Sequence, residues 1–351
     1  MKRFALLTLV LVPSLAAADH VTVKGTVLEG KVKSVSAKQV VMETVYGKGD
    51  LVIATSDVTA IETDAPFHVY QADDGVAVGP VVGITPAAVT VTEGGAPKDI
   101  AFENVQAAPR DAGPDANWFQ RRPVESPWWS GHADASYSST NGTTNTSAMA
   151  FGVGLLRERG PSRTKLEASY MRSTSQAKFE TDDSRHVTVA ELRGLARQEY
   201  DATAHLFGFG SMEAENDGVE RLSYRLIPKL GAGYKLANTE TYYLGADAGV
   251  SYVYERFHDN SINNYAALAL GAEQNWKLPW LGSVWHTRVD YLPAFSDPFD
   301  DYRLRGETSL VIPIYEQLAL KTSLVDDYNP LPAPDTSRNS LTSLIGLSLI
   351  Y

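Results

Sequence analysis

The chain has 351 residues, no cysteine and a formal net charge of −11. Without cysteine it can form no disulfide, no thiol nucleophile and no cysteine-based metal site. The acidic balance makes nucleic acid a poor partner, because phosphate contacts require a basic surface.

The first residues predict a secretory signal peptide over residues 1–18. Lys2 and Arg3 precede a short apolar run, and Ala16 and Ala18 form an A-x-A cleavage site, so we expect cleavage after Ala18. An N-terminal membrane anchor is the alternative, but the run is about half of the roughly 20 apolar residues that a spanning helix needs. Since no later run is longer, the rest of the chain is expected to be either soluble or a membrane β-barrel.

Residues 19–108 predict a small β-domain. Short alternating segments rich in Val and Thr are separated by turn residues such as Gly25 and Gly30. The stretch beginning "VTVKGTVLEG" and the later one beginning "FHVYQADDGV" show the same order of strands and turns. We interpret this order as a weak duplication of two SH3- or Sm-like units, with a plain β-sandwich as the alternative.

Residues 109–128, "PRDAGPDANWFQRRPVESPW", predict a linker. The prolines and mixed charges of this segment argue against a packed element. Longer alternating segments begin after this stretch, so we expect a domain boundary here.

Residues 129–351 predict a membrane barrel. Alternating segments of roughly ten residues recur between polar connections, a pattern typical of outer-membrane β-barrels. We identify about twelve such segments, near residues 130–140, 147–157, 163–173, 187–200, 204–215, 220–236, 241–256, 263–278, 283–293, 301–313, 317–328 and 340–351. The predicted fold is therefore all-β, an antiparallel transmembrane barrel of about 12 strands preceded by a small periplasmic β-domain.

The connections predict which end of the barrel faces the cell exterior. Connections such as "STSQAKFETDDSR" and "YNPLPAPDTSRNS" alternate along the chain with tight ones such as "RERGPS" and "LPWLG". Outer-membrane barrels carry their longer loops outside and short turns in the periplasm. We therefore expect the N-terminal domain in the periplasm.

Residue parity predicts which side chains face lipid. Leu222, Tyr224, Leu226 and Leu230 share one face of the sixth segment, opposite Arg225 and Lys229. A charge on the lipid face costs about 2–4 kcal/mol at the bilayer midplane, so the charged faces are expected to point inward. The fifth segment is ambiguous, because Phe207 and Phe209 share parity with acidic residues. The predicted lumen charge network comprises Glu191, Arg193, Arg197, Glu215, Asp217, Arg225, Lys229, Asp247, Glu255, Arg288, Asp290, Arg303, Arg305 and Glu307.

The last segment ends in apolar residues at alternate positions and an aromatic residue. Leu347, Leu349 and Tyr351 resemble the C-terminal signal by which outer-membrane barrels are presented to the barrel assembly machinery. Most such signals end in Phe, and Tyr351 is a tolerated variant. We therefore expect this machinery to be a partner.

The barrel region resembles the family of salt-induced outer membrane proteins, also known as domain of unknown function 481. The stretch "MEAENDGVERLSYRLIPKLGAGYKL" carries the family's Glu-x-Asp, Arg and Gly-x-Gly-Tyr pattern at Glu215, Asp217, Arg225, Gly231, Gly233 and Tyr234. The usual Lys-x-Asp before the last strand is absent and is replaced around Asn339. The N-terminal units resemble the Sm-like modules that precede the barrel in some members. The resemblance implies fold and location, since the family's activity is unsettled.

Two classes of function remain open at this point. The first is structural support or a narrow channel for small polar solutes, with an N-terminal module that contacts peptidoglycan or a periplasmic protein. The second is a lipid-hydrolysing barrel enzyme, although His132, His186 and His286 show no evident pairing with a serine. A soluble secreted β-protein is a further alternative. The seven histidines lack metal-ligand spacing, so we expect neither a metal nor another cofactor.

Overall fold

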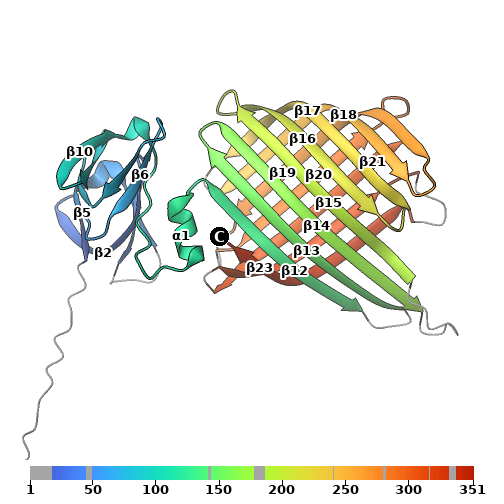
Figure 1. The fold of residues 1–351 in the computed structure, drawn as a ribbon, viewed down its shortest axis with the longest axis horizontal. Helices are drawn as coiled ribbons and strands as arrows, with labels where there is room; N and C mark the ends of the chain where they lie inside the picture. The colour runs from blue at the N-terminus through green and yellow to red at the C-terminus, as the bar shows by residue number, and fades with distance from the viewer. Residues whose placement is uncertain are drawn as a thin grey trace, which may run out of the picture. The chain divides into compact units, whose positions relative to one another are not determined.

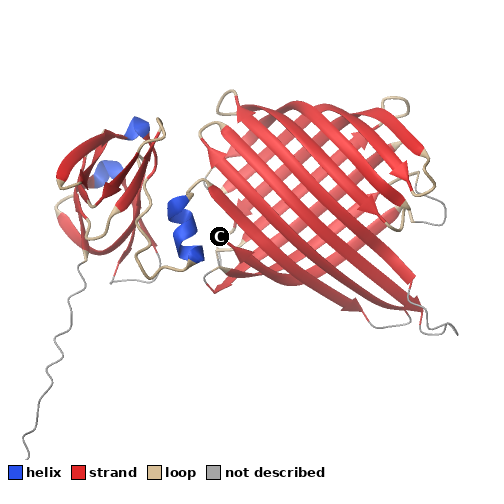
Figure 2. Ribbon diagram, in the orientation of Figure 1, coloured by secondary structure: helices blue, strands red, loops and turns tan. Residues whose placement is uncertain are grey.

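The computed structural model describes residues 18–44, 50–140, 144–177, 186–239, 241–279, 282–315, 317–331 and 337–351. The chain divides into two compact units, Met1–Pro127 and Trp128–Tyr351. Figure 2 shows that both units are built almost entirely of strands. Most of the predicted signal peptide, Ala16 included, lies outside the described residues.

The first unit contains two groups of short antiparallel strands. The first group is β1 (Asp19–Val23), β2 (Thr26–Val35), β3 (Gln39–Thr44), β4 (Asp50–Ala54), the 3-10 turn η1 (Thr55–Asp57) and β5 (Val58–Glu62). The second is β6 (Phe67–Gln71), β7 (Val76–Gly79), β8 (Val81–Ile84), β9 (Ala88–Glu93), β10 (Ala96–Ala101), η2 (Phe102–Asn104) and β11 (Val105–Ala107). The sheet orders are β4-β3-β2-β1-β5, β10-β9-β8 and β11-β6-β7.

The order of elements in the two groups is the same once β7 and β8 are read as one strand. Pro80 lies between these two strands, and proline cannot donate to a strand ladder. Each group then has four strands, a single 3-10 turn and a fifth strand that pairs with the first. The two groups bury their side chains in one shared core, which includes Val21 and Val32 from the first and Phe67 and Val89 from the second.

A partly buried ion-pair cluster joins distant segments of this unit. The Arg110 guanidinium donates to the carboxylates of Asp19 and Asp64. Asp19 is 1% exposed and also accepts from the backbone N–H of Val32, at 2.7 Å. Asp19 and Arg110 are 91 residues apart in the chain, so the cluster joins the first strand to the segment that follows β11.

The sequence predicts no packed element between residues 109 and 128, and the structure differs there. Helix α1 (Trp118–Glu125) begins with a capping box, in which the side chains of Asn117 and Gln120 each accept from the other's backbone N–H. The hydroxyl of Tyr70 donates to the carbonyl oxygen of Val124 at 2.6 Å, and Val124 is buried. The N-x-x-Q pattern is therefore a local helix signal that the prolines of this segment, including Pro123 inside the helix, do not cancel.

The second unit is a closed antiparallel barrel of twelve strands (Figure 1). The strands are β12 (Trp129–Thr140), β13 (Thr144–Arg159), β14 (Ser162–Ala177), β15 (His186–Asp201), β16 (Leu206–Asp217), β17 (Leu222–Asn238), β18 (Tyr242–Phe257), β19 (Ile262–Lys277), β20 (Val284–Pro293), β21 (Tyr302–Tyr315), β22 (Leu318–Tyr328) and β23 (Asn339–Ile350). Each strand pairs with its neighbour in the chain, and β23 closes the ring on β12. The predicted all-β fold with a 12-stranded barrel is confirmed.

The two ends of the barrel differ in the length of their connections. The strand ends separated by the longest stretches of sequence all lie at one end, which we name the long-loop end: Ala177 and His186, Pro293 and Tyr302, and Tyr328 and Asn339. At the other end β13 and β14 are joined by residues 160–161 alone, and β12 begins and β23 ends there. We name it the terminal end.

Side chains alternate between lipid and lumen as the sequence predicts, with one exception on β17. Leu230 is 68% exposed, whereas Arg225 and Lys229 are buried. Leu222 was predicted to face lipid together with Tyr224, but it is fully buried. The pairing of β17 with β18 shifts register between Leu222 and Tyr224, and such a bulge reverses the face of every residue beyond it.

Aromatic side chains gather near both ends of the barrel wall. At the long-loop end the rings of Tyr302 and Tyr328 stack at 5.8 Å. At the terminal end Trp276 and Trp285 stack at 6.3 Å. Paired aromatic girdles of this kind flank the lipid-facing band of outer-membrane barrels. Among the described residues no helix is long and apolar enough to cross a membrane.

Candidate functional site: two cavities in an ionic lumen

Arg225 is the most enclosed cation of the lumen, with 2% of its surface exposed. Its Nη1 donates to Glu215 at 2.7 Å, its Nη2 to Glu220 at 3.1 Å and its Nε to Glu255 at 2.6 Å. The guanidinium thus uses all three nitrogens, as a planar fork permits. A buried charge without partners is costly, so these three carboxylates and Arg225 depend on one another.

A second set of ion pairs crosses the lumen. Arg193 on β15 contacts Glu191 and Glu215, each at 3.0 Å. Arg305 on β21 contacts Glu191 at 3.2 Å and Asp327 at 2.6 Å. Strands β15 and β21 are not neighbours in the barrel, so the bond between Glu191 and Arg305 spans the interior.

A third set lies closer to the terminal end. Arg197 donates to Glu199 at 2.6 Å and to Asp247 at 3.1 Å. Arg288 donates to Asp290 at 2.7 Å and lies 3.8 Å from Asp247. The carboxylate of Asp247 is therefore shared by arginines from β15 and β20.

Phe207 and Phe209, whose facing the sequence leaves open, point into the lumen and are buried. The guanidinium carbon of Arg197 lies 3.9 Å from the ring centroid of Phe209, a cation–π contact. The ring of Phe207 lies against Gly233, where a Cβ atom would come within 2.1 Å of it. The Gly-x-Gly run of β17 therefore makes room for two aromatic rings inside the barrel.

Two large cavities lie in the described part of the lumen. One, of about 500 Å³, opens at the long-loop end and is lined by Glu215, Glu220 and Arg303 among others. The other, of about 460 Å³, opens at the terminal end and is lined by His132, Lys165 and Glu273 among others. Both cavities share Arg193, Glu213 and Arg305 as lining residues. These three side chains, which we call the dividing layer, separate the cavities.

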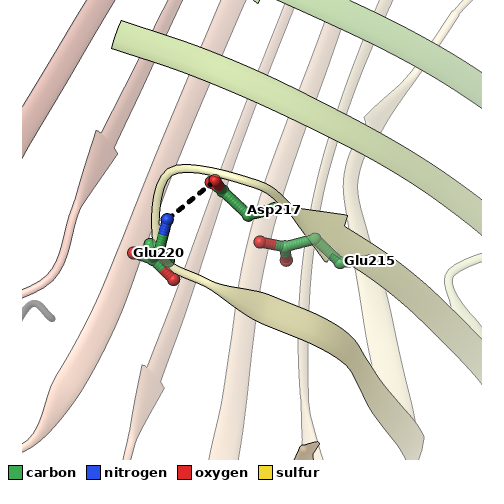
Figure 3. Close-up of side chains that lie close together, drawn as sticks. All are labelled: Glu215, Asp217 and Glu220. Atoms are coloured by element: carbon green, nitrogen blue, oxygen red, sulfur yellow. Dashed lines mark hydrogen bonds between the residues drawn. The ribbon is translucent and has the colours of Figure 1, made fainter. Parts of the chain in front are cut away.

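The long-loop cavity contains a compact group of three carboxylates. Glu215, Asp217 and Glu220 each place one oxygen within 4.8 Å of the others. Figure 3 shows Asp217 at the end of β16, with its carboxylate turned toward the backbone N–H of Glu220. Two of the three carboxylates already accept from Arg225. The group is thus charge-compensated by an arginine, and it gives no ground for a metal site.

The structure brings most of the predicted lumen residues together. Arg193, Arg225, Arg288 and Arg305 all form short ion pairs with predicted partners, and Lys229 pairs with Glu213 at 2.9 Å. Arg303 is farther from its partners, at 3.6 Å from Glu255. Asp217 caps the turn between β16 and β17 by accepting from Val219 and Glu220.

Other lumen residues were missed by the sequence prediction. Arg163 and Lys165 on β14, Glu273 on β19 and Lys321 on β22 also line the terminal-end cavity. The sequence contained the signal that would have identified the residues on β14, because Arg163, Lys165 and Glu167 occupy every second position and therefore share one face of the strand. Glu213 was also missed, although Glu215 on the same face of the same strand was included in the prediction.

Two histidines line the terminal-end cavity, and each contacts an acidic or amide side chain. His132 Nε2 lies 3.6 Å from Asp134 Oδ2. His286 Nδ1 lies 2.8 Å from Asn275 Oδ1. A hydrolase of the serine type requires a nucleophile within hydrogen-bond reach of its base. These two contacts do not supply that arrangement.

Comparison with solved structures finds other membrane barrels of low sequence identity. The NanC porin has a TM-score of 0.39 and 6% identity, covering 63% of this chain and 99% of its own. The translocator domain of the autotransporter NalP from Neisseria meningitidis has a TM-score of 0.34 and 11% identity, with coverage of 63% and 87%. A FadL homologue from Pseudomonas aeruginosa has a TM-score of 0.28 and 11% identity, with coverage of 95% and 88%.

Comparison with curated proteins finds no match. A protein-family profile does match, and it covers residues 133–351, which is nearly the whole barrel and more than half of the chain. The description of that family is "Protein of unknown function, DUF481". The chain therefore belongs to the DUF481 family, in agreement with the resemblance seen in its Glu-x-Asp and Gly-x-Gly-Tyr stretches.

Proposed function

We propose that this outer-membrane-type barrel is a narrow channel for small polar solutes. The observation that carries the proposal is that two cavities enter the lumen from opposite ends and share the side chains of Arg193, Glu213 and Arg305. A single layer of side chains thus separates them. A path between the cavities would need only these side chains to change rotamer, with no change in the barrel wall.

The charges of the lumen favour solutes that are neutral overall. The dividing layer contains both signs, and Glu191 and Glu215 pair with its arginines. Rings of one sign select ions of the opposite sign in channels. A lumen of paired charges instead offers donors and acceptors together, as a zwitterion or a small polyol requires.

Solute flux into liposomes tests this proposal. The full chain would be reconstituted and the entry of glycine and of sucrose measured by swelling. We expect glycine to enter faster than sucrose, and R305A to accelerate both, because it removes a side chain of the dividing layer. R256A is the control, since Arg256 lies near a turn and donates to the loop residue Asn260.

The alternative is a structural barrel whose ion pairs plug the lumen. It predicts no glycine entry above that of empty liposomes in either the wild type or R305A. Each variant would first be shown to form the closed barrel by its gel mobility before and after boiling.

The cellular arrangement is part of the proposal. The predicted signal peptide would direct export, and Leu347, Leu349 and Tyr351 would engage the barrel assembly machinery. The N-terminal domain would lie in the periplasm and contact peptidoglycan or another protein. Protease added to intact cells is expected to spare this domain, and permeabilising the outer membrane is expected to expose it. Its digestion in intact cells would contradict the orientation.

A further inference from the structure

The connection between β20 and β21, residues 294–301, begins by continuing the outer wall of the barrel. Ala294 forms a bridge with Ala267, and the backbone N–H of Phe295 donates to the carbonyl oxygen of Ala266 at 3.0 Å. Both contacts keep the register in which β20 pairs with β19, so the alternation of faces extends through these residues. Ala294 is accordingly buried, whereas Phe295 is 57% exposed on the face that also carries Tyr291.

The rest of this connection turns back along the same outer face. The hydroxyl of Tyr291 donates to the carbonyl oxygen of Pro298 at 3.2 Å. The backbone N–H of Asp301 donates to the carbonyl oxygen of Asp297 at 2.9 Å, which closes the turn. Phe299 follows the tethered Pro298 and is 86% exposed, the largest exposed fraction of any large hydrophobic side chain in the described residues.

We propose that this connection is a membrane anchor, in which Phe295 and Phe299 insert at the boundary between the head groups and the acyl chains of the surrounding lipid. The partner is the lipid surface around the barrel, because Phe295 lies on the outer face and Phe299 follows a residue that is tethered to it. This inference concerns the outer wall, and it does not depend on flux along the lumen.

The tyrosines beside the connection indicate its height in the membrane. Tyr302 lies opposite Pro293, and its ring contacts Tyr291 edge-on at 5.4 Å and stacks on Tyr328 at 5.8 Å. An outward aromatic band of this kind marks the membrane interface. Phe295 lies two residues beyond Pro293, about 7 Å along the strand, which a tilt of about 40° reduces to about 5 Å along the membrane normal. The interfacial layer on each side of a bilayer is about 5–8 Å thick, so this height lies within it.

The chemistry of the connection also suits a lipid interface. Exposed apolar groups that are rimmed by polar residues mark contacts with a membrane or another protein, and removal of the two rings from water is favourable. Asp297 and Asp300 are exposed on either side of Phe299, so their carboxylates can stay in the hydrated head-group layer. Residues 294–301 are all described, and none of them lines the long-loop cavity. The connection is therefore directed away from the lumen.

Site-directed spin labelling tests the proposal, because the chain has no cysteine and an introduced thiol is the only one. A label at the exposed position S296C would be studied in the full chain in phosphatidylcholine vesicles. Its collisions with oxygen, which concentrates among acyl chains, would be compared with its collisions with a water-soluble nickel chelate. V289C on the lipid-facing wall and D259C in an exposed turn at the same end provide the membrane and water references.

We expect the ratio of oxygen to nickel collisions at S296C to exceed that at D259C and to lie below that at V289C. F299D should lower the ratio at S296C to the value at D259C, because a carboxylate does not remain at the boundary of the acyl chains. L331D is the matched control, since Leu331 is 62% exposed in the connection between β22 and β23. It should leave the ratio at S296C unchanged.

A ratio at S296C equal to that at D259C, without any second substitution, would overturn the proposal. Few collisions with both reagents would also overturn it, because that result would show that a protein surface covers the anchor. An equal decrease in F299D and L331D would contradict the role of Phe299. Gel mobility before and after boiling would first show that each variant forms the closed barrel, so that a changed ratio reports on the connection alone.

Discussion

The ring of Phe207 lies against Gly233 of the neighbouring strand, and a Cβ on that glycine would fall 2.1 Å from Phe207 Cζ. Phe207 is 2% exposed, so the ring has little room to move aside. We predict that G233A destabilises the barrel by about 1–3 kcal/mol, the usual cost of overpacking. G306A is the matched control, because nothing lies within 4 Å of a Cβ at Gly306.

Urea unfolding of the barrel, followed by gel mobility without boiling, measures this difference. Equal midpoints for G233A and G306A would contradict the account of the Gly-x-Gly run. G233A combined with F207A should recover part of the loss, since the smaller side chain removes the collision.

Arg225 provides a prediction about the buried charges. R225L removes one ion-pair partner from each of Glu215, Glu220 and Glu255 at once. Breaking a buried ion pair from one side costs about 3–5 kcal/mol, because the remaining charge stays uncompensated. R225K keeps the charge but cannot reproduce three bonds from a planar fork, so its unfolding midpoint should lie between those of wild type and R225L.

The control for Arg225 is R256A, which removes an exposed side chain of the next strand. Substitutions of this kind are usually within about 0.5 kcal/mol of wild type. An R225L barrel as stable as R256A would show that the ion pairs of Arg225 do not contribute to the stability of the barrel.

Asp111 gives the N-terminal domain a dependence on pH. The hydrogen bond from His68, together with that from the backbone N–H of Gly113, lowers the pKa of Asp111 below its usual value. A carboxylate with a lowered pKa stabilises the fold fully above its unfolded pKa, near 4, and loses this contribution as pH falls through the folded value. The domain in the full chain should therefore become less stable below about pH 4.

Amide hydrogen exchange of β6 against pH measures this effect. D111N should weaken the dependence, and D115N, at an exposed position, should leave it as in wild type. The side chain of Asp111 is 34% exposed, so the change should be small. An identical pH dependence in D111N and wild type would exclude the role of this bond.

Tyr351 closes the ring at the terminal end of the junction between β12 and β23. Its backbone exchanges two hydrogen bonds of 3.0 Å with Gly131, and its ring occupies the place that a Cβ of Gly131 would need. We predict that Y351S lowers the fraction of folded barrel in outer membranes, whereas Y351F retains it. Heat-modifiable mobility of isolated membranes gives the fraction, and equal fractions in both variants would contradict the prediction.

Sequence periodicity predicts the barrel well, because charged side chains can point to only one side of a strand whose other side faces lipid. A charged residue on that wall is costly, so parity assigns Arg225 and Lys229 to the lumen directly. Parity fails at Leu222, where a bulge reverses the alternation. Parity is also uninformative at Phe207, because the sequence does not distinguish an aromatic residue that faces lipid from one that faces the lumen. The structure shows that the ring faces the lumen and lies against Gly233.

The features that form the candidate site depend on contacts between distant strands. Glu191 and Arg305 are 114 residues apart, and no local pattern pairs them. The dividing layer likewise follows from the closure of the ring. Helix α1 is different, because the N-x-x-Q pattern at Asn117 and Gln120 was a readable local signal.

Single-channel recording in planar bilayers tests the central claim most directly, because it detects the ion current that passes the dividing layer of a single barrel. The full-length wild type is expected to give discrete conductance steps, R305A to give larger steps, and R256A to match wild type. An absence of steps in wild type and in R305A, from protein shown to be a closed barrel, would contradict the claim that the two cavities form one path.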